Sequence, residues 1–586
     1  MKKNLLLFFS CMLVCVCTMG QWSNDPAVNN RITPEDMSLY DTEIKTSKDD
    51  ITYVLFSHPN NNGTVTKLQI IDKDGNLLFP EEGKVISNER TRSYNMVNDL
   101  LFVDDDGNAL IVVSDRRNAS PESDDLSYTL YKVDPTGEML WGEDGIDLEQ
   151  GRTNKIEAQM KIVQIENGSY VFAWLEGQSG LQNVHLQHLS KDGDFLWDNG
   201  VELKEETVLY TYPFLVNAGN NQVILVYIKG TNKDIYARKI DFDGSSVWSA
   251  DTRIYRGGFP EIGLHTIIDV IPDNKGGVFV GWCDDRSFTD KESTYVSHVN
   301  ANGQLSYSAG EEGQRVGYSE LRSFAPFMAY NENDNCLYVT WRETSGGQGS
   351  QRLMAQRIEM TGELKWGDEG LEITPLEEQQ IGHYSIQNAP NGNIAIFYML
   401  STGNVYPVDS YVTLLNNKGE TVWKNEQIAF TKRSSYKSGL ESSKLVNNKY
   451  WLATWIDDRT IENGEVTSSH KILYAQRINA DGTLGASSST SINQSEATME
   501  DETFKAIPSL IDENTSFIVD NKNQGNVDIN IYSLSGKKLA TVYSGYMAEG
   551  RHEITWNAKS ALILKGMYIA TLSTSQDIKS TRIILK

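Results

Sequence analysis

The residues best suited to chemistry stand where strand-like runs end. An acidic residue and an arginine follow a tryptophan in Trp282-Cys-Asp-Asp285-Arg286 and in Trp455-Ile-Asp-Asp458-Arg459, with weaker versions at Asp115-Arg116 and Trp341-Arg342-Glu343. Arginine offers forked donors to carboxylate or sulfate, and aspartate accepts hydrogen bonds from sugar hydroxyls. The pattern predicts a rim that binds a glycan or polyanion, made of Asp115, Arg116, Asp285, Arg286, Arg342, Asp458 and Arg459. The competing interpretation is that each charged pair ties neighbouring elements together.

Motifs for catalysis and for metal binding are absent from the sequence. It contains no phosphate-binding Gly-x4-Gly-Lys-Ser/Thr loop, no Gly-x-Ser-x-Gly elbow, no His-Glu-x-x-His pair and no sialidase Asp box. Asp72-Lys-Asp74-Gly75 and Asp241-Phe-Asp243-Gly244 are similar to fragments of calcium loops, but aspartate also suits a hairpin turn. We therefore expect no metal site and no cofactor, with calcium as the alternative, and the catalytic residues, if any exist, are unknown.

One pattern recurs along most of the chain. Two strand-like runs lead to a tight turn with glycine, and an aromatic residue follows. The turn glycines are spaced by 51 to 63 residues, and they are Gly75, Gly137, Gly193, Gly244, Gly303, Gly362, Gly419 and Gly482. Four short antiparallel strands in a unit of this length are typical of a β-propeller blade. The sequence predicts an all-β fold with a propeller of eight blades, or of seven if one irregular unit forms no blade.

The two ends of the repeat region complement each other. The segment beginning Trp22-Ser-Asn-Asp matches the half of a repeat that follows the turn, whereas the last turn, at Gly482, lacks its aromatic residue. We expect the N-terminus to supply the outer strand of the last blade and so to close the ring. The aromatic residues after the other turns, such as Trp197 and Trp248, could form a sugar-stacking array. Their fixed position in every repeat favours packing between blades.

Composition and charge narrow the classes of partner. The chain has 586 residues, 39% of them hydrophobic, which is enough for a large core. Its formal net charge is −26, and no long basic run interrupts the acidic surface. Both features argue against a nucleic acid or an anionic membrane as the partner.

The N-terminus has the layout of a secretory signal peptide. Lys2 and Lys3 precede an apolar run, and we expect cleavage after Gly20. The run is too short for a membrane span, so the protein is not expected to be an integral membrane protein, and a lipoprotein signal is the alternative. Cleavage leaves two cysteines, Cys283 and Cys336, which the repeat alignment places too far apart for a disulfide.

The C-terminal part differs in pattern from the repeats. We divide the chain into a signal peptide (1–20), a propeller (21–485), a polar linker (486–506) and a small immunoglobulin-like β-sandwich (507–586) with strands near 527–534, 539–543, 566–572 and 581–585. The words NIYSLSGKKL, KGMYIATL and STRIILK resemble the C-terminal sorting domain of type IX secretion cargo in Bacteroidetes. They include Ser535, Gly536, Lys537, Gly566, Tyr568 and Lys586. The Pro-Asn-Pro that opens such domains is replaced by residues 514–517, which leaves open whether the domain is cleaved or retained.

These features lead to a functional expectation. The resemblance implies export through the periplasm by the type IX machinery, to the medium or to the cell surface. The propeller is then expected to present a non-catalytic binding face to a glycan or to a surface protein. The alternatives are a carbohydrate-active enzyme, a glycoside hydrolase or lyase that uses carboxylates on the same face, and a purely structural envelope component.

Overall fold

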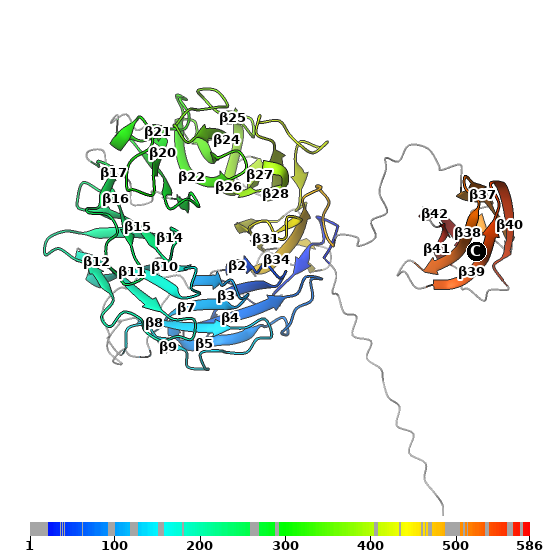
Figure 1. Cartoon of the computed structure of the whole chain (residues 1–586), viewed down its shortest axis with the longest axis horizontal. Coiled ribbons are helices and arrows are strands. Elements are labelled where there is room, and N and C mark those ends of the chain that lie inside the picture. The colour runs from blue at the N-terminus through cyan, green and yellow to red at the C-terminus, as the bar shows by residue number, and fades with distance from the viewer. Residues whose placement is uncertain are drawn as a thin grey trace, which may run out of the picture. The chain divides into compact units, whose positions relative to one another are not determined.

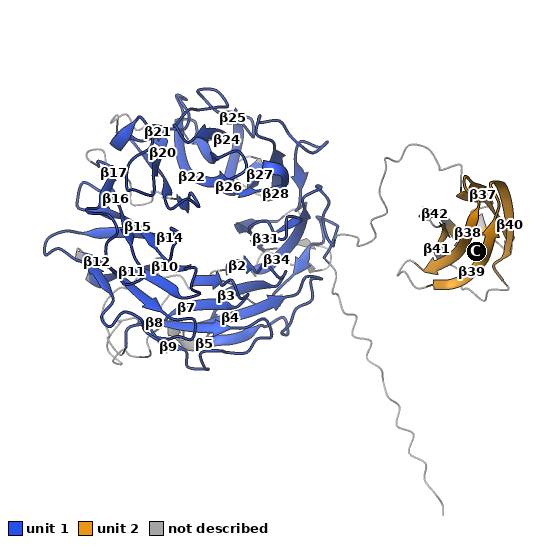
Figure 2. Ribbon diagram, in the orientation of Figure 1, with its two compact units in different colours: residues 1–487 blue, residues 488–586 orange. Residues whose placement is uncertain are grey.

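A computed structural model covers the chain as two compact units, residues 1–487 and 488–586, which Figure 2 shows in different colours. Each unit is described separately. The structure describes residues 22–34, 37, 39, 42–60, 63–91, 100–115, 117, 127–150, 158–178, 181–257, 269–286, 292–347, 349–402, 408–432, 435–458, 461–462, 465–466, 471–486, 504–507, 510–511, 514–533, 538–559, 566–574 and 578–585.

The described residues of the first unit form eight antiparallel blades of four strands. The first four blades are β2 to β5 (Thr42–Thr46, Thr52–Asn60, Gly63–Ile71, Lys84–Thr91), β6 to β9 (Leu100–Val103, Ala109–Asp115, Ser127–Val133, Ile146–Asp147), β10 to β13 (Ala158–Gln164, Tyr170–Gln178, Leu181–Leu189, Val201–Leu203) and β14 to β17 (Tyr210–Asn217, Val223–Lys229, Asp234–Ile240, Thr252–Tyr255). The next three are β18 to β21 (Asp269–Pro272, Val278–Asp284, Ser293–Val299, Gln314–Arg315), β22 to β25 (Arg322–Asn331, Cys336–Thr344, Ser350–Glu359, Leu371–Glu372) and β26 to β29 (Glu377–Asn388, Ile394–Thr402, Val408–Leu415, Ile428–Ala429). The eighth contains β30, β31, β34 and β1 (Lys437–Ser442, Tyr450–Asp457, Ile472–Asn479, Asn30–Arg31).

The blades are arranged in a ring, as Figure 1 shows. The first strand of each blade, which we call its inner strand, contacts the inner strand of the next blade, and β30 contacts β2 to complete the circle. Between the sixth and seventh blades, β24 pairs with β26 as well as with β25. The propeller predicted from the repeats is confirmed, with eight blades rather than seven.

The N-terminus closes the ring. Strand β1 pairs with β34, so that Asn30 lies opposite Ala475, and the backbone N–H of Ile32 donates to the Leu473 carbonyl at 2.9 Å. The Asn29 side chain donates to the Phe430 carbonyl, also at 2.9 Å. Residues from the two ends of the first unit therefore share one sheet, as the incomplete first and last repeats predicted.

Each blade is joined to the next by an aromatic side chain packed on a turn glycine. The Trp248 ring is packed so closely on Gly303 that a methyl group at that glycine would lie 2.8 Å from Cδ2, and the indole N–H donates to the Ala301 carbonyl at 3.0 Å. Because Gly303 has a φ of +77°, a conformation that other residues rarely adopt, the joint favours glycine for two reasons. The aromatic residues after the turns therefore lie in the blade joints rather than in an exposed sugar-binding array.

The eighth joint has the same geometry as the others. Trp22, which is 3% exposed, packs against Gly75 and donates its indole N–H to the Lys73 carbonyl at 3.2 Å. This is the aromatic residue that the turn at Gly482 lacks. The ring is thus completed by a residue that precedes the first blade in the sequence.

The antiparallel order of the strands gives the ring two different faces. The turn face carries the connections from the first to the second strand and from the third to the fourth, including the glycine turns. The loop face carries the connections from the second to the third strand and from one blade to the next. It includes those from Asp115 at the end of β7 to Ser127 at the start of β8 and from Tyr255 at the end of β17 to Asp269 at the start of β18, and connections of similar length, such as that from Val299 to Gln314, lie on the turn face.

Polar contacts hold the turn face together. In the second blade, Lys132 lies 3.3 Å from the Asp104 carboxylate and donates to the Lys191 carbonyl of the next blade at 3.0 Å. In the fifth, His298 lies 2.9 Å from Asp273, and both side chains are 3% exposed. Burial raises the pKa of Asp273, but hydrogen bonds from His298 and from backbone N–H groups outweigh it and hold that pKa below its usual range. These two buried pairs are therefore part of the wall of the ring.

The second unit is a β-sandwich. One sheet has the order β35–β37–β40 (Phe504–Ile507, Asn514–Asn521, Gly550–Asn557), and the other has the order β36–β42–β41–β38–β39 (Leu510–Ile511, Ile578–Leu585, Gly566–Ser573, Gly525–Ser533, Lys538–Met547). The predicted sandwich is confirmed. Of the residues in the sorting-domain words, Gly566 pairs with Leu585 and Tyr568 packs on the core, whereas Ser535, Gly536, Lys537 and Lys586 lie outside the described residues.

Two further expectations concern the cysteines and the membrane. Cys283 and Cys336 are both buried and are not joined in a disulfide, as the alignment of the repeats predicted. Within the described ranges, the chain has no helix with the length and apolar character needed to span a bilayer.

Candidate functional site

The predicted rim residues occupy equivalent places on the loop face. Asp115 is the last residue of β7, Asp285 and Arg286 follow β19, and Asp458 follows β31. Arg116 and Arg459 lie outside the described residues. The structure thus brings the ends of the second strands to one face, and the contacts of each described side chain show what it does there.

Arg286 is held by its own blade. Its guanidinium group donates to both carboxylate oxygens of Asp284, at 2.6 and 2.8 Å, and to the Glu312 carbonyl at 2.7 Å, and it lies 3.7 Å from the centre of the Tyr295 ring. Burial lowers the pKa of Arg286, but the bonds to Asp284 reverse that effect and raise it. The arginine is therefore fixed in the wall, as the structural interpretation of the charged pairs proposed.

The acidic partner of Arg286 is Asp284 rather than Asp285. Asp284 lies two residues after Trp282, so both side chains point to the same face of β19, and the indole N–H donates to the Asp284 carboxylate at 2.9 Å. Asp285 follows the end of β19 and is only partly buried. The acid that holds Arg286 is therefore two residues before it in the sequence rather than the adjacent one.

The same arrangement recurs in two other blades. In the sixth, the Trp341 indole donates to Glu343 at 3.1 Å, and Arg352 on β24 lies 2.8 Å from the same carboxylate. In the eighth, the Trp455 indole donates to Asp457 at 3.1 Å. The tryptophan and the buried acid two residues later form a structural unit of the loop face.

Arg342 and Asp458 also have partners in the wall. Arg342 on β23 donates to the Ile381 carbonyl of the next blade at 3.0 Å. The Asp458 carboxylate accepts the backbone N–H of Tyr436 at 2.8 Å. These bonds support the structural interpretation for both residues, and the predicted ligand contacts stay predictions.

One charged cluster on the loop face was missed in the sequence. Lys437, 3% exposed at the start of β30, donates to the Val408 carbonyl at 2.7 Å, and the carboxyl groups of Asp409 and Asp458 feel its charge. Burial raises the pKa of both acids, although Lys437 opposes it. Asp409 lies on the third strand of its blade, opposite Leu400 on the second strand. The end of the second strand therefore carries a leucine in the sequence, and Asp409 is found only when the pairing of the two strands is known.

The aspartates of the glycine turns are occupied within the turns. Both carboxylate oxygens of Asp72 accept hydrogen bonds, from the backbone N–H groups of Asp74 and Asn76 at 2.9 and 2.8 Å and from the Asn76 amide at 2.7 Å. This is the behaviour expected of aspartate in a hairpin turn. Across the part of the chain that the structure describes, no group of three or more histidine, cysteine, aspartate or glutamate residues could hold a metal ion.

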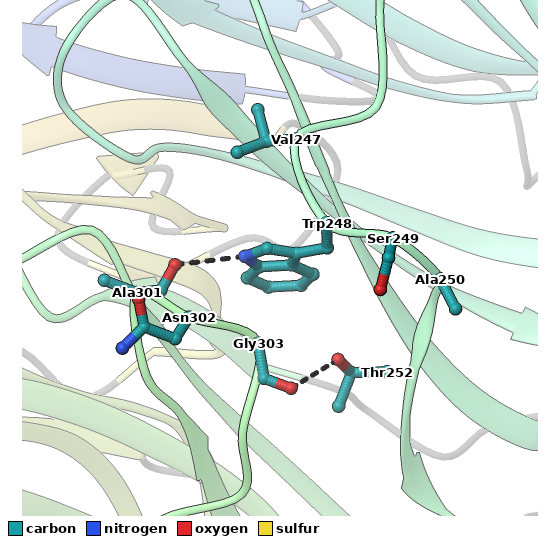
Figure 3. Close-up of a pocket in the computed structure, with 8 residues that line it drawn as sticks. All are labelled: Val247, Trp248, Ser249, Ala250, Thr252, Ala301, Asn302 and Gly303. Atoms are coloured by element: carbon teal, nitrogen blue, oxygen red, sulfur yellow. Dashed lines mark hydrogen bonds between the residues drawn. The ribbon is translucent and has the colours of Figure 1, made fainter.

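A groove of about 360 Å³ lies beside the joint of Trp248, and Figure 3 shows its lining. The two dashed contacts are the Trp248 bond to the Ala301 carbonyl and the Thr252 hydroxyl bond to the Gly303 carbonyl at 2.6 Å. Both contacts join neighbouring blades. The tryptophan is therefore engaged in the joint and does not offer its face to a ligand.

Comparison with known proteins finds similarity to solved structures at low identity. No family model matches the chain, and no curated protein matches it in sequence. Among solved structures it is similar to an acylaminoacyl peptidase in complex with Z-Gly-Gly-Phe-chloromethyl ketone (10% identity, TM-score 0.36, 73% of this chain and 59% of that chain), and so it spans about three fifths of the peptidase. It is also similar to the Penicillium chrysogenum alpha-L-arabinanase complexed with arabinobiose (16%, TM-score 0.32, 55% and 93%) and to the polysaccharide lyase Uly1 (9%, TM-score 0.37, 67% and 92%).

Proposed function

We propose that this protein is an exported β-propeller whose loop face is a non-catalytic binding face, displayed at the cell surface or released. The observation that carries the proposal is that the ends of the second strands, with the acidic residues and arginines that follow their tryptophans, all lie on the loop face. Buried ion pairs such as Arg286–Asp284 and Arg352–Glu343 fix these strand ends, and surface connections that start from a fixed scaffold are where binding residues concentrate.

The charged groups of the loop face fit a binding role better than a catalytic one. Arg286, Arg342, Arg352 and the acids Asp284 and Glu343 contact one another or the backbone, so they fix the ends of the strands from which the connections start. A rigid scaffold that presents variable connections is the usual design of a binding surface. We propose a glycan or a surface protein as the ligand.

Export by the type IX machinery is a separate part of the proposal. It rests on the resemblance of the C-terminal words to the sorting domain. Deleting residues 507–586 should leave the protein in the periplasm, as measured by protease accessibility on intact cells and by fractionation. Normal surface delivery of the truncated chain would contradict this part and would leave the binding face unaffected.

The enzyme alternative has one observation in its favour. Asp409 and Asp458 on the loop face both have a raised pKa, the property a general acid needs near neutral pH. If these carboxyl groups act on a sugar, Asp409→Asn and Asp458→Asn should each abolish product release while leaving retention intact.

One experiment separates the two functions. The mature chain, residues 21–586, is passed over a panel of immobilised polysaccharides, in calcium and in chelator, and retention and soluble products are recorded together. The binding proposal expects retention without products. Soluble products that are absent with Asp409→Asn would show that the protein is an enzyme. If no polysaccharide of the panel retains the chain, a glycan ligand is excluded and a surface protein is the remaining proposed ligand.

A further inference from the structure

Three side chains on the turn face of the fifth blade form a chain of hydrogen bonds. The Ser306 hydroxyl lies 2.9 Å from Nδ1 of His298, and Nε2 of the same imidazole lies 2.9 Å from a carboxylate oxygen of Asp273. The His298 and Asp273 side chains are 3% exposed, whereas Ser306 is only partly buried. A hydroxyl group bonded to a base, with a third group that holds the base, is an arrangement suited to nucleophilic chemistry.

The hydrogen bonds decide which nitrogen of His298 acts as the base. The pKa of Asp273 lies below its usual range in spite of burial, so its carboxyl group is ionised at neutral pH and only accepts hydrogen bonds. In the neutral imidazole, Nε2 must therefore carry the proton that is donated to Asp273. This tautomer leaves the lone pair of Nδ1 to accept the proton of the Ser306 hydroxyl.

The position of Ser306 lies at the surface of the ring. Three residues after the turn glycine, the second, third and fourth blades carry Leu140, Leu196 and Val247, which are 45%, 47% and 41% exposed. Their backbone N–H groups donate to the carbonyl eight residues earlier, just as Ser306 donates to the His298 carbonyl at 2.9 Å. The hydroxyl of Ser306 is therefore at an accessible place in the blade, with its base buried behind it.

A serine and a histidine in the third blade share the contact but not its setting. Ser169 Oγ lies 2.6 Å from Nε2 of His188, yet Ser169 is only 4% exposed. Nδ1 of His188 lies 3.1 Å from the Phe242 carbonyl rather than from a carboxylate. Ser169 is thus an internal comparison for Ser306, with the same base but without the acidic partner and without access.

We propose that Ser306 is a nucleophile that takes the acyl group of an activated ester. Ser306 Oγ forms a bond to the acyl carbon while its proton passes to Nδ1 of His298. The bond from that carbon to the alkoxide oxygen then breaks, and the alkoxide leaves with the same proton as an alcohol. The product on the protein is acyl-Ser306. His298 is the general base, and Asp273 is a positioning residue that acts through it.

The backbone limits the class of ester. The Ser306 N–H is used in its bond to the His298 carbonyl, so it does not stabilise an oxyanion on the acyl group. Esters with a good leaving group need this stabilisation least and are the expected substrates. The inference goes beyond the proposed function, since the site lies on the turn face and does not depend on what the loop face binds.

The test is covalent labelling of the folded mature chain with a fluorophosphonate probe, whose phosphorus takes the place of the acyl carbon, followed by peptide mass spectrometry. We expect label on Ser306, none on Ser169, and none at this peptide in Ser306→Ala, which changes one surface hydroxyl. An excess of p-nitrophenyl acetate, an activated ester, should slow the labelling because both compounds compete for one hydroxyl group.

Asp273→Asn tests the positioning residue. Oδ1 of Asp273 accepts the backbone N–H groups of Lys275 and Gly277, both at 2.7 Å, so the amide oxygen of asparagine takes that place and the NH2 group faces His298. The amide then donates to Nε2, the imidazole proton moves to Nδ1, and the base is lost. We expect labelling of Ser306 to slow by about a hundredfold or more, with the near-UV circular dichroism of the folded chain unchanged.

Three results would overturn the proposal. The first is a folded chain in which the probe labels no serine, and the second is equal labelling of Ser306 and Ser169. The third is a labelling rate that neither p-nitrophenyl acetate nor Asp273→Asn changes. If Asp273→Asn does not fold, the comparison of Ser306 with Ser169 in the wild-type chain and the competition by p-nitrophenyl acetate decide.

Discussion

The joint made by Trp22 gives the sharpest prediction about the fold. Trp22 is 3% exposed, packs on Gly75 and donates to the Lys73 carbonyl at 3.2 Å. Replacing a buried tryptophan by alanine costs about 3–5 kcal/mol, and the lost hydrogen bond adds about 1 kcal/mol. We therefore expect Trp22→Ala to destabilise the propeller by about 4–6 kcal/mol.

This free energy converts to a shift in melting temperature. Unfolding entropy is about 2.1 cal/mol/K per residue, so roughly 460 residues that unfold as one unit give about 1 kcal/mol/K and a shift of about 4–6 °C. Differential scanning calorimetry of the mature chain measures it. Leu78→Ala, at a position 48% exposed, is the control and should stay within about 0.5 kcal/mol.

Deleting residues 22–33 is the stronger version of the same perturbation. It removes β1 together with Trp22, exposes an edge of β34 and should cause aggregation. If Trp22→Ala melts at the same temperature as the wild-type chain, Trp22 does not hold the ring closed.

Three other predictions follow from named contacts. Gly303→Ala should destabilise the propeller more than Gly230→Ala. Both glycines have φ near +78°, but an added methyl group would contact a neighbour, Trp248, only at Gly303. Equal melting temperatures of the two variants would show that the joint tolerates the extra methyl group. Arg286→Ala should lower the free energy of unfolding, measured by urea titration, by about 3–5 kcal/mol because it leaves the fully buried Asp284 without its cation. Arg253→Ala removes a more exposed ion pair with Glu311 and should lower the free energy of unfolding by only about 0–1 kcal/mol. Burial raises the pKa of Asp269 from 3.8 to about 6, so the folded chain holds this proton more tightly than the unfolded chain, and stability falls as pH rises from about 4 through 6. Asp269→Asn should therefore be more stable than the wild-type chain at pH 8, by about 3 kcal/mol, and equal to it at pH 3; the same difference at both pH values would refute the assignment.

The architecture could be predicted from the repeats because the residues that define each blade are close together in the sequence. The glycine turns and the aromatic residues after them define one joint per blade, and the unmatched halves at Trp22 and Gly482 showed where the ring closes. These are features of neighbouring residues. They needed no knowledge of contacts between blades.

The contacts of the site could not be predicted as fully, because they depend on which face of a strand each side chain occupies and on which residues pair between strands. The partner of Arg286 is Asp284, which alternation along β19 decides, and Asp409 becomes visible only opposite Leu400.

The central claim is that ligand binds on the loop face. Hydrogen exchange with mass spectrometry, on the mature chain with and without a polysaccharide or protein that it retains, tests this most directly. We predict added protection at the strand ends near Asp115, Asp284 and Asp457 and none at the glycine turns. Protection concentrated at the turns around Gly303 and Gly419, with the loop face unchanged, would contradict the claim.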